Sequence, residues 1–217
     1  TTAMRLGELE CGLVIGVESM SRTPHVARGL RGGVRVGPVE LQDPIYPIEY
    51  GGFNPVSRDA ADGAERFGVS KAMMDAWALG SHRKWAAAAA AGRFADEIVP
   101  VRVPTRGGET RFDRDEFPRP DARLAAIEQL PPVFGARTIT AGNAPGLNDG
   151  AAAAVVMTAA RATELGLVPL AEVVAASGVT EDPTGIAWVP ATAIRAALER
   201  AGIGLDQIDL IEINEAF

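Results

Sequence analysis

The sequence predicts an α/β fold into which a large irregular subdomain is inserted. Residues 11–16 form a short continuous apolar run, which is typical of a strand buried on both faces of a parallel sheet. From Thr140 onward, helical and strand patterns alternate at lengths that indicate right-handed βαβ units. Between these regions, residues 20–138 lack this alternation, so we interpret them as the inserted subdomain.

Composition and charge narrow the class of protein. The chain has 217 residues, 47% of them hydrophobic, which is enough to bury a real core. A net charge of -7 argues against nucleic acid or an anionic membrane as a partner, because phosphate binding needs a basic surface. No apolar run approaches the roughly 20 residues of a membrane helix. With a single cysteine, Cys11, and no visible signal peptide, the prediction is a soluble cytoplasmic protein.

Several local elements follow from capping and turn signals. Residues 1–10 read as the second half of an amphipathic helix, so both ends of the sequence read as interior positions of a longer protein. A helix is predicted over residues 58–67, and a longer one begins at the N-cap Ser70 and stops at Gly92. The other predicted elements are a hairpin formed by residues 98–103 and the turn at 107–108, helices at 122–129, 148–165 and 191–201, and strands at 171–176 and 208–213.

Five motifs, by their residues and by their order and spacing along the chain, resemble those of the thiolase family. The two most specific are the turn-rich segment 140–153, which feeds an alanine-rich stretch, and Asn214-Glu215-Ala216-Phe217. The others are residues 16–21 after the apolar run, residues 92–94 with 96–100, and residues 115–117 with Arg119-Pro120. Together they extend over essentially the whole chain.

The resemblance implies a thiolase-like αβαβα layered fold, present in part, with an inserted loop domain. On that template, residues 1–167 are the C-terminal part of the thiolase N-terminal domain and include the loop domain at about 20–138. Residues 168–217 are then the start of the C-terminal domain.

The resemblance also implies an activity. A thiolase-type acyltransferase exchanges acyl groups between acetyl-CoA and a 3-ketoacyl-CoA by Claisen condensation and thiolysis. The implied partner is coenzyme A, whose thioesters are substrates, so no cofactor is expected, and the full-length protein is expected to be a homodimer or homotetramer. The family's nucleophilic cysteine would precede Thr1, and its catalytic histidine and acid/base cysteine would follow Phe217. This chain alone is therefore expected to be inactive.

The resemblance assigns roles to seven residues. Asn214 matches the asparagine that holds a water in the oxyanion hole, a task that suits a neutral amide; the alternative is an asparagine that caps the next helix. The residues implied to bind coenzyme A are Arg119, Ala141, Pro145, Leu147, Ala216 and Phe217. Arg119 would contact the phosphate end of the ligand, although a surface arginine in a proline-rich loop is an equal reading.

Three reactive residues, one cysteine and two histidines, are not assigned to a site. Cys11 lies in the apolar run, where burial would make its thiol inert. His25 and His82 have no partners at the spacing of a catalytic triad or of metal ligands, so no metal site is predicted.

One segment departs from the family pattern. Residues 55–61, Pro-Val-Ser-Arg-Asp-Ala-Ala, stand where many thiolases carry an acyl-pocket motif. The departure motivates an alternative function, a non-catalytic thiolase-like protein that binds acyl-CoA or lipid. A third alternative is a scaffold whose loop domain mediates assembly without affinity for coenzyme A.

Overall fold

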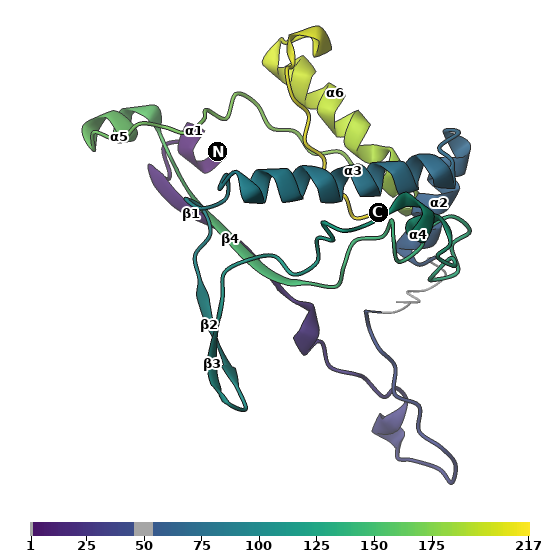
Figure 1. The fold of residues 1–217 in the computed structure, drawn as a ribbon. Helices are drawn as coiled ribbons and strands as arrows, with labels where there is room; N and C mark the ends of the chain where they lie inside the picture. The colour runs from purple at the N-terminus through teal and green to yellow at the C-terminus, as the bar shows by residue number, and fades with distance from the viewer. Residues whose placement is uncertain (1, 46–53) are drawn as a thin grey trace. The chain divides into compact units, whose positions relative to one another are not determined.

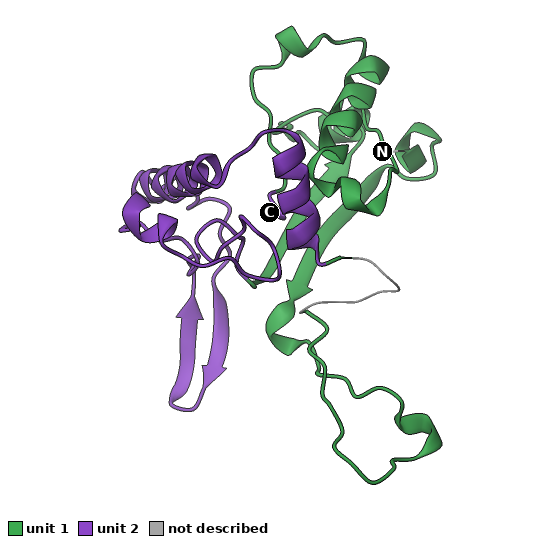
Figure 2. Cartoon of the chain, turned by 90° about the vertical axis from the view of Figure 1, so that its right-hand side faces the viewer, with its two compact units in different colours: residues 1–54, 147–214 green, residues 55–146, 215–217 purple. Residues whose placement is uncertain are grey.

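The computed structural model describes residues 2–45 and 54–217, which divide into two compact units (Figure 2). Unit 1 comprises Thr1–Asn54 and Leu147–Asn214, and unit 2 comprises Pro55–Gly146 and Glu215–Phe217. Each unit is therefore built from segments that are distant in the sequence.

Unit 1 contains a two-stranded antiparallel ribbon, formed by β1 (Cys11–Ser19) and β4 (Asp149–Met157), which lie side by side in Figure 1. The register pairs Cys11 with Met157 and Ser19 with Asp149. Just beyond this end, the backbone N–H and hydroxyl of Ser21 donate to the Asp149 carboxylate at 2.9 and 2.5 Å. These hydrogen bonds lower the pKa of Asp149 because they favour its charged form, and the bond from the Ser21 hydroxyl has the largest effect.

The prediction of a parallel strand buried on both faces is wrong for the described residues. Both described ladders are antiparallel, and the apolar side chains of β1 are exposed, with Leu13 at 63%, Val14 at 57% and Ile15 at 61% of their full accessibility. The physical reason is that β1 and β4 make their extensive contacts with each other, and within the described chain no helix covers either face of the ribbon broadly.

The helix predicted over residues 148–165 is also wrong in its first half, where β4 lies. Alanine has high helix propensity, but nine successive residues here pair with β1, and such long-range pairing overrides a local preference of a few tenths of a kcal/mol per residue. The helical part is α5 (Ala159–Glu164), which begins where the Thr158 hydroxyl accepts the Arg161 N–H at 3.2 Å.

Most of the remaining described residues of unit 1 have no regular secondary structure. The strands predicted at 171–176 and 208–213 are not formed, because neither segment has a ladder partner among the described residues. The helix predicted at 191–201 is confirmed as α6 (Val189–Ala201), and α1 covers Thr2–Arg5 of the predicted first helix. Short 3₁₀ turns lie at η1 (Met20–Arg22), η2 (Leu30–Gly32), η3 (Pro183–Ala187) and η4 (Leu205–Gln207).

Unit 2 follows the sequence-based predictions closely. Its elements are α2 (Val56–Arg66), α3 (Lys71–Ala90), α4 (Leu124–Glu128) and a hairpin of β2 (Val101–Thr105) and β3 (Gly108–Phe112). These confirm both helices around residue 70, the short helix before Gln129 and the hairpin. A small core of Ala61, Ala136 and Ile139, on which Met74, Val133 and Ala144 pack, holds α2 and α3 against residues 133–144.

The ends of α3 are set by local chemistry. The Ser70 hydroxyl accepts the Met73 N–H at 3.3 Å and so satisfies one of the first free donors of the helix. At the other end Gly92 adopts a φ of 69°, a left-handed conformation that glycine adopts without strain and that stops the helix.

We expect Ser70→Ala to lower the free energy of unfolding of unit 2 by about 1 kcal/mol, because the Met73 N–H loses its acceptor. Ser70→Asp, which keeps an acceptor at the cap, should preserve it. Urea unfolding followed by the fluorescence of Trp77 and Trp85 on α3, in a Trp188→Phe background, measures both effects. Equal losses in the two variants would contradict the capping role.

Across residues 2–45 and 54–217, no helix combines the length and the apolar character needed to cross a membrane.

Candidate functional site

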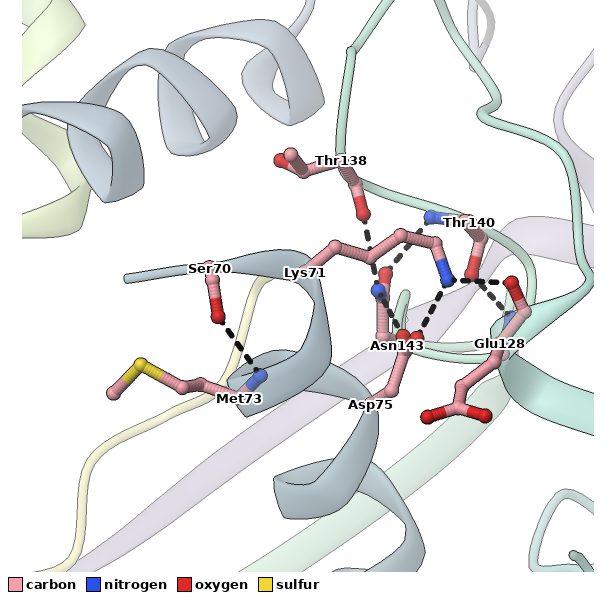
Figure 3. Close-up of polar contacts among 9 residues, drawn as sticks. Ser70, Lys71, Met73, Asp75, Glu128, Thr138, Thr140 and Asn143 are labelled. Atoms are coloured by element: carbon pink, nitrogen blue, oxygen red, sulfur yellow. Dashed lines mark hydrogen bonds and ion pairs between the residues drawn. The ribbon is translucent and has the colours of Figure 1, made fainter. Parts of the chain in front are cut away.

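The turn at residues 140–146 is fixed to α3 by a buried polar network (Figure 3). The Asn143 side chain is its centre. Its Nδ2 donates to Asp75 Oδ1 at 2.8 Å and to the Thr138 carbonyl at 3.1 Å, while its Oδ1 accepts the Thr140 N–H at 2.8 Å. Asp75 and Thr140 are only 1% and 0% exposed, so a single amide side chain satisfies groups that water does not reach.

Lys71 neutralises the buried carboxylate. Its Nζ atom lies 2.5 Å from Asp75 Oδ2, one helical turn away on α3, and also donates to the Glu128 carbonyl at the end of α4 at 3.2 Å. A buried carboxylate is costly unless it is paired and hydrogen-bonded, and Asp75 is both. The network therefore joins α3, α4 and the turn into one rigid group.

Gly142 lets the turn approach α4 closely. A Cβ atom at this position would lie 2.7 Å from Leu130 Cδ1 and 2.8 Å from Ile127 Cγ2, well inside normal contact. The Gly142 N–H also donates to the Thr140 hydroxyl at 3.2 Å. The glycine is thus explained by packing within unit 2.

The same arrangement leaves two predicted ligand contacts on the outside of the turn. Ala141 and Pro145 are exposed, whereas Asn143 is part-buried and Thr140 is fully buried. The turn therefore presents small side chains and backbone to solvent from a fixed support. A surface of this kind suits close approach by an extended ligand arm.

Arg119 lies in an exposed loop that is folded tightly on itself. Its Nη1 donates to the carbonyls of Glu116 and Phe117, each at 2.9 Å, and its guanidinium lies 5.9 Å from the centre of the Phe117 ring. The backbone N–H of Arg119 donates to Nδ1 of His82 on α3 at 3.2 Å. A guanidinium carries five donors, so Nε and Nη2 are left for an anion.

His82 therefore has a partner that the sequence analysis did not predict. Its ring lies 6.0 Å from that of Phe117, centre to centre. Partial burial, and after it the nearby charge of Arg119, lower the pKa of His82 because both disfavour the imidazolium form. The contact escaped prediction because it joins residues 37 positions apart through a backbone donor, which carries no signal in the sequence.

The expectation that Cys11 is buried is wrong. Its thiol is free and the residue is exposed at the start of β1, because the ribbon has no covering layer among the described residues. Within the same part of the chain, no group of three or more histidine, cysteine, aspartate or glutamate residues is arranged to hold a metal ion.

The other predicted site residues are divided between the units. Asn214 and Leu147 belong to unit 1, and both are exposed. Ala216 and Phe217 belong to unit 2 with Arg119, Ala141 and Pro145, and the neighbouring Glu215 accepts the Trp77 indole N–H at 2.9 Å. Their roles stay predictions.

Residues 55–61, which depart from the family's acyl-pocket motif, lie at the beginning of α2. Ser57 and Ala61 are 2% and 3% exposed, and Ala61 is part of the unit 2 core. In this chain the segment therefore supports packing.

Sequence reasoning selected the turn but missed what holds it. Lys71 and Asp75 are spaced by four residues on a predicted helix, a spacing that favours an ion pair. An asparagine between turn glycines is likewise a recognised source of side chain to backbone hydrogen bonds. Neither signal reveals that the two groups meet.

The chain is similar to thiolases along its whole length. The family described as "Thiolase, N-terminal domain" matches residues 1–160, and "Thiolase, C-terminal domain" matches residues 167–217. The chain is 43% identical to an acetyl-CoA acetyltransferase of Pseudomonas aeruginosa, with 99% of this chain and 56% of that protein aligned. It is 42% identical to a beta-ketoadipyl-CoA thiolase of Pseudomonas putida, over 99% of this chain and 56% of the relative.

Solved structures agree with this similarity. Human mitochondrial 3-ketoacyl-CoA thiolase superposes with a TM-score of 0.91 at 35% identity, covering 100% of this chain and 56% of that one. A structure of the human enzyme in complex with CoA gives a TM-score of 0.90 at 34% identity, covering 100% of this chain and 55% of that one.

These neighbours define an α/β protein with the thiolase fold, so the predicted fold class is confirmed. The chain belongs to the thiolase family, as its motifs indicated. It spans a little over half the length of the curated relatives it matches.

Proposed function

We propose that this chain carries the coenzyme A-binding part of a thiolase-type acyltransferase, which exchanges acyl groups between acetyl-CoA and a 3-ketoacyl-CoA. The observation that carries the proposal is the turn at 140–146, which the Asp75–Asn143 contact fixes from inside while Ala141 and Pro145 stay exposed. Relatives named acetyl-CoA acetyltransferase or thiolase support it.

Each site residue has a part in this proposal. Ala141, Pro145 and Leu147 line the pantetheine arm, and Ala216 and Phe217 also contact coenzyme A. Arg119 contacts the phosphate end of the ligand with the donors that its own loop does not use. Asn214 orients a water that stabilises the thioester oxyanion. Coenzyme A acts as a substrate in this scheme, and assembly into homodimers or homotetramers in the cytoplasm stays a prediction.

The test is coenzyme A binding to this chain, measured by isothermal titration calorimetry. We expect Arg119→Ala to weaken binding roughly tenfold, which is about 1.4 kcal/mol and typical for one charge-assisted hydrogen bond that is partly open to water. Pantetheine, which lacks the nucleotide, should bind the wild type and the variant equally.

Arg106→Ala is the matched control, because Arg106 is an exposed arginine at the tip of the β2–β3 hairpin. It should bind coenzyme A as the wild type does. Equal losses of affinity in the two arginine variants would show that Arg119 acts only through the overall charge of the chain. The absence of any coenzyme A binding would refute the proposed function.

A further inference from the structure

The contact between His82 and Arg119 joins the long helix of unit 2 to the loop that carries the proposed phosphate-binding side chain. Nδ1 of His82 accepts the backbone N–H of Arg119 at 3.2 Å, and the His82 ring lies against Phe117. The Arg119 guanidinium in turn holds the carbonyls of Glu116 and Phe117. One imidazole therefore supports the loop from the helix side.

This hydrogen bond exists for one protonation state of the histidine. Nδ1 can accept when the ring is neutral and its proton is on Nε2, whereas in the imidazolium form both ring nitrogens are donors. Protonation would therefore place two N–H groups opposite each other and add a positive charge beside Arg119.

We propose that His82 is a positioning residue for coenzyme A binding: neutral His82 holds the Arg119 backbone in place, and protonated His82 releases it. The inference rests on the proposed function, because it assumes that Arg119 contacts the ligand. It differs from that proposal in naming a group that touches no ligand and makes the affinity depend on pH.

The surroundings of His82 lower the pH at which its ring becomes protonated. Partial burial and, after it, the charge of Arg119 in the facing loop lower the pKa of His82. Glu116 lies in the same loop with its carbonyl bound by Arg119, and Arg83 is the next residue on α3. The folded protein thus favours neutral His82 more than the unfolded chain does. The supported loop is fully present above the ordinary histidine pKa of 6.5, and it is lost as the pH falls through the lowered pKa of His82 in the folded protein.

The experiment compares wild type with His82→Gln and His82→Leu in coenzyme A titrations from pH 8 down to the pH at which NMR shows the His82 ring to be protonated. Glutamine can accept the Arg119 N–H at either pH, whereas leucine can accept at neither. The ligand's terminal phosphate itself titrates near pH 6, so every variant will show some pH dependence. His82→Gln measures that background.

We expect wild type to lose roughly fivefold more affinity than His82→Gln between pH 8 and the pH at which the His82 ring is protonated, as the loss of about one net hydrogen bond implies. His82→Leu should be roughly fivefold weaker than wild type at pH 8 and should show only the background dependence. In NMR spectra, the Arg119 amide signal should shift with the His82 ring titration in wild type and stay constant in His82→Gln.

Two outcomes separate this inference from the function on which it rests. If Arg119→Ala weakens coenzyme A binding but wild type and His82→Gln share one pH profile across the range in which the His82 ring titrates, the positioning role alone is wrong. If Arg119→Ala leaves binding unchanged, both the ligand contact of Arg119 and the positioning role are wrong.

Discussion

Replacing Lys71 with methionine is expected to lower the free energy of unfolding of unit 2 by about 3 to 5 kcal/mol. Asp75 is 1% exposed, and the substitution leaves its carboxylate buried without the ammonium group that lies 2.5 Å away. The side chain that is removed is itself 27% exposed, so inspection of exposure alone would suggest a mild change. The cost arises from the charge that stays behind.

A double-mutant cycle tests this explanation. Asp75→Asn keeps an oxygen that can accept from Asn143, so alone it should cost less than Lys71→Met. Combined with Lys71→Met it should recover part of the stability, because no buried charge is left. Urea unfolding followed by α3 tryptophan fluorescence provides the free energies.

Arg102→Met is the matched control for the ion pair. Arg102 lies 3.4 Å from Glu109 on the hairpin, and both side chains are exposed, at 81% and 55%. We expect a change within about 0.5 kcal/mol for this surface pair. A Lys71→Met effect of the same size would show that the Lys71–Asp75 contact has no special role.

The second large effect is expected for Gly142→Ala, at about 1 to 3 kcal/mol of lost stability. The new Cβ would meet Leu130 Cδ1, the end of a flexible side chain, and also Ile127 Cγ2, which is bound to a stiff, buried β-branched carbon. The Ile127 side chain has little room to move, so the turn itself must shift. Coenzyme A affinity should then fall together with stability.

Rescue and control variants are available for this position. Ile127→Ala removes the obstructing methyl group, so the double variant should bind coenzyme A more tightly than Gly142→Ala alone, even though it loses core packing. Gly80→Ala is the control, because nothing lies within 4 Å of the added Cβ and the site is inside α3. It should stabilise unit 2 by up to about 1 kcal/mol. Binding unaffected by Gly142→Ala would contradict the role of the turn.

Local chemistry explains which parts of the fold could be predicted from the sequence. Ser70 and Gly92 predict the two ends of α3 within a few residues, and the two glycines at 107–108 predict the hairpin turn. These signals act over three or four residues and do not depend on the rest of the chain. Unit 2 was therefore predicted well.

Long-range pairing explains the failures in unit 1. Residues 149–157 have the composition of a helix but form a strand, because they pair with β1. This pairing could not be predicted, since β1 lies more than a hundred residues earlier in the sequence. Contacts between residues far apart in the sequence also limited the prediction of the candidate site. Asp75 and Asn143 are 68 positions apart, so the sequence does not reveal the contact between them that holds the turn. The ligand-contact residues, in contrast, were selected by family motifs.

The exposed β1–β4 ribbon affects how the isolated chain behaves at high concentration. The ribbon is nine residues long, has no proline, and presents Leu13, Val14, Ile15 and Val17 to solvent beside two unpaired backbone edges among the described residues. Such an edge is a template for intermolecular strand addition and aggregation. Glu18 is the one charged residue within β1 that opposes stacking of like strands. Intermolecular strand addition at this ribbon is therefore expected as the isolated chain is concentrated.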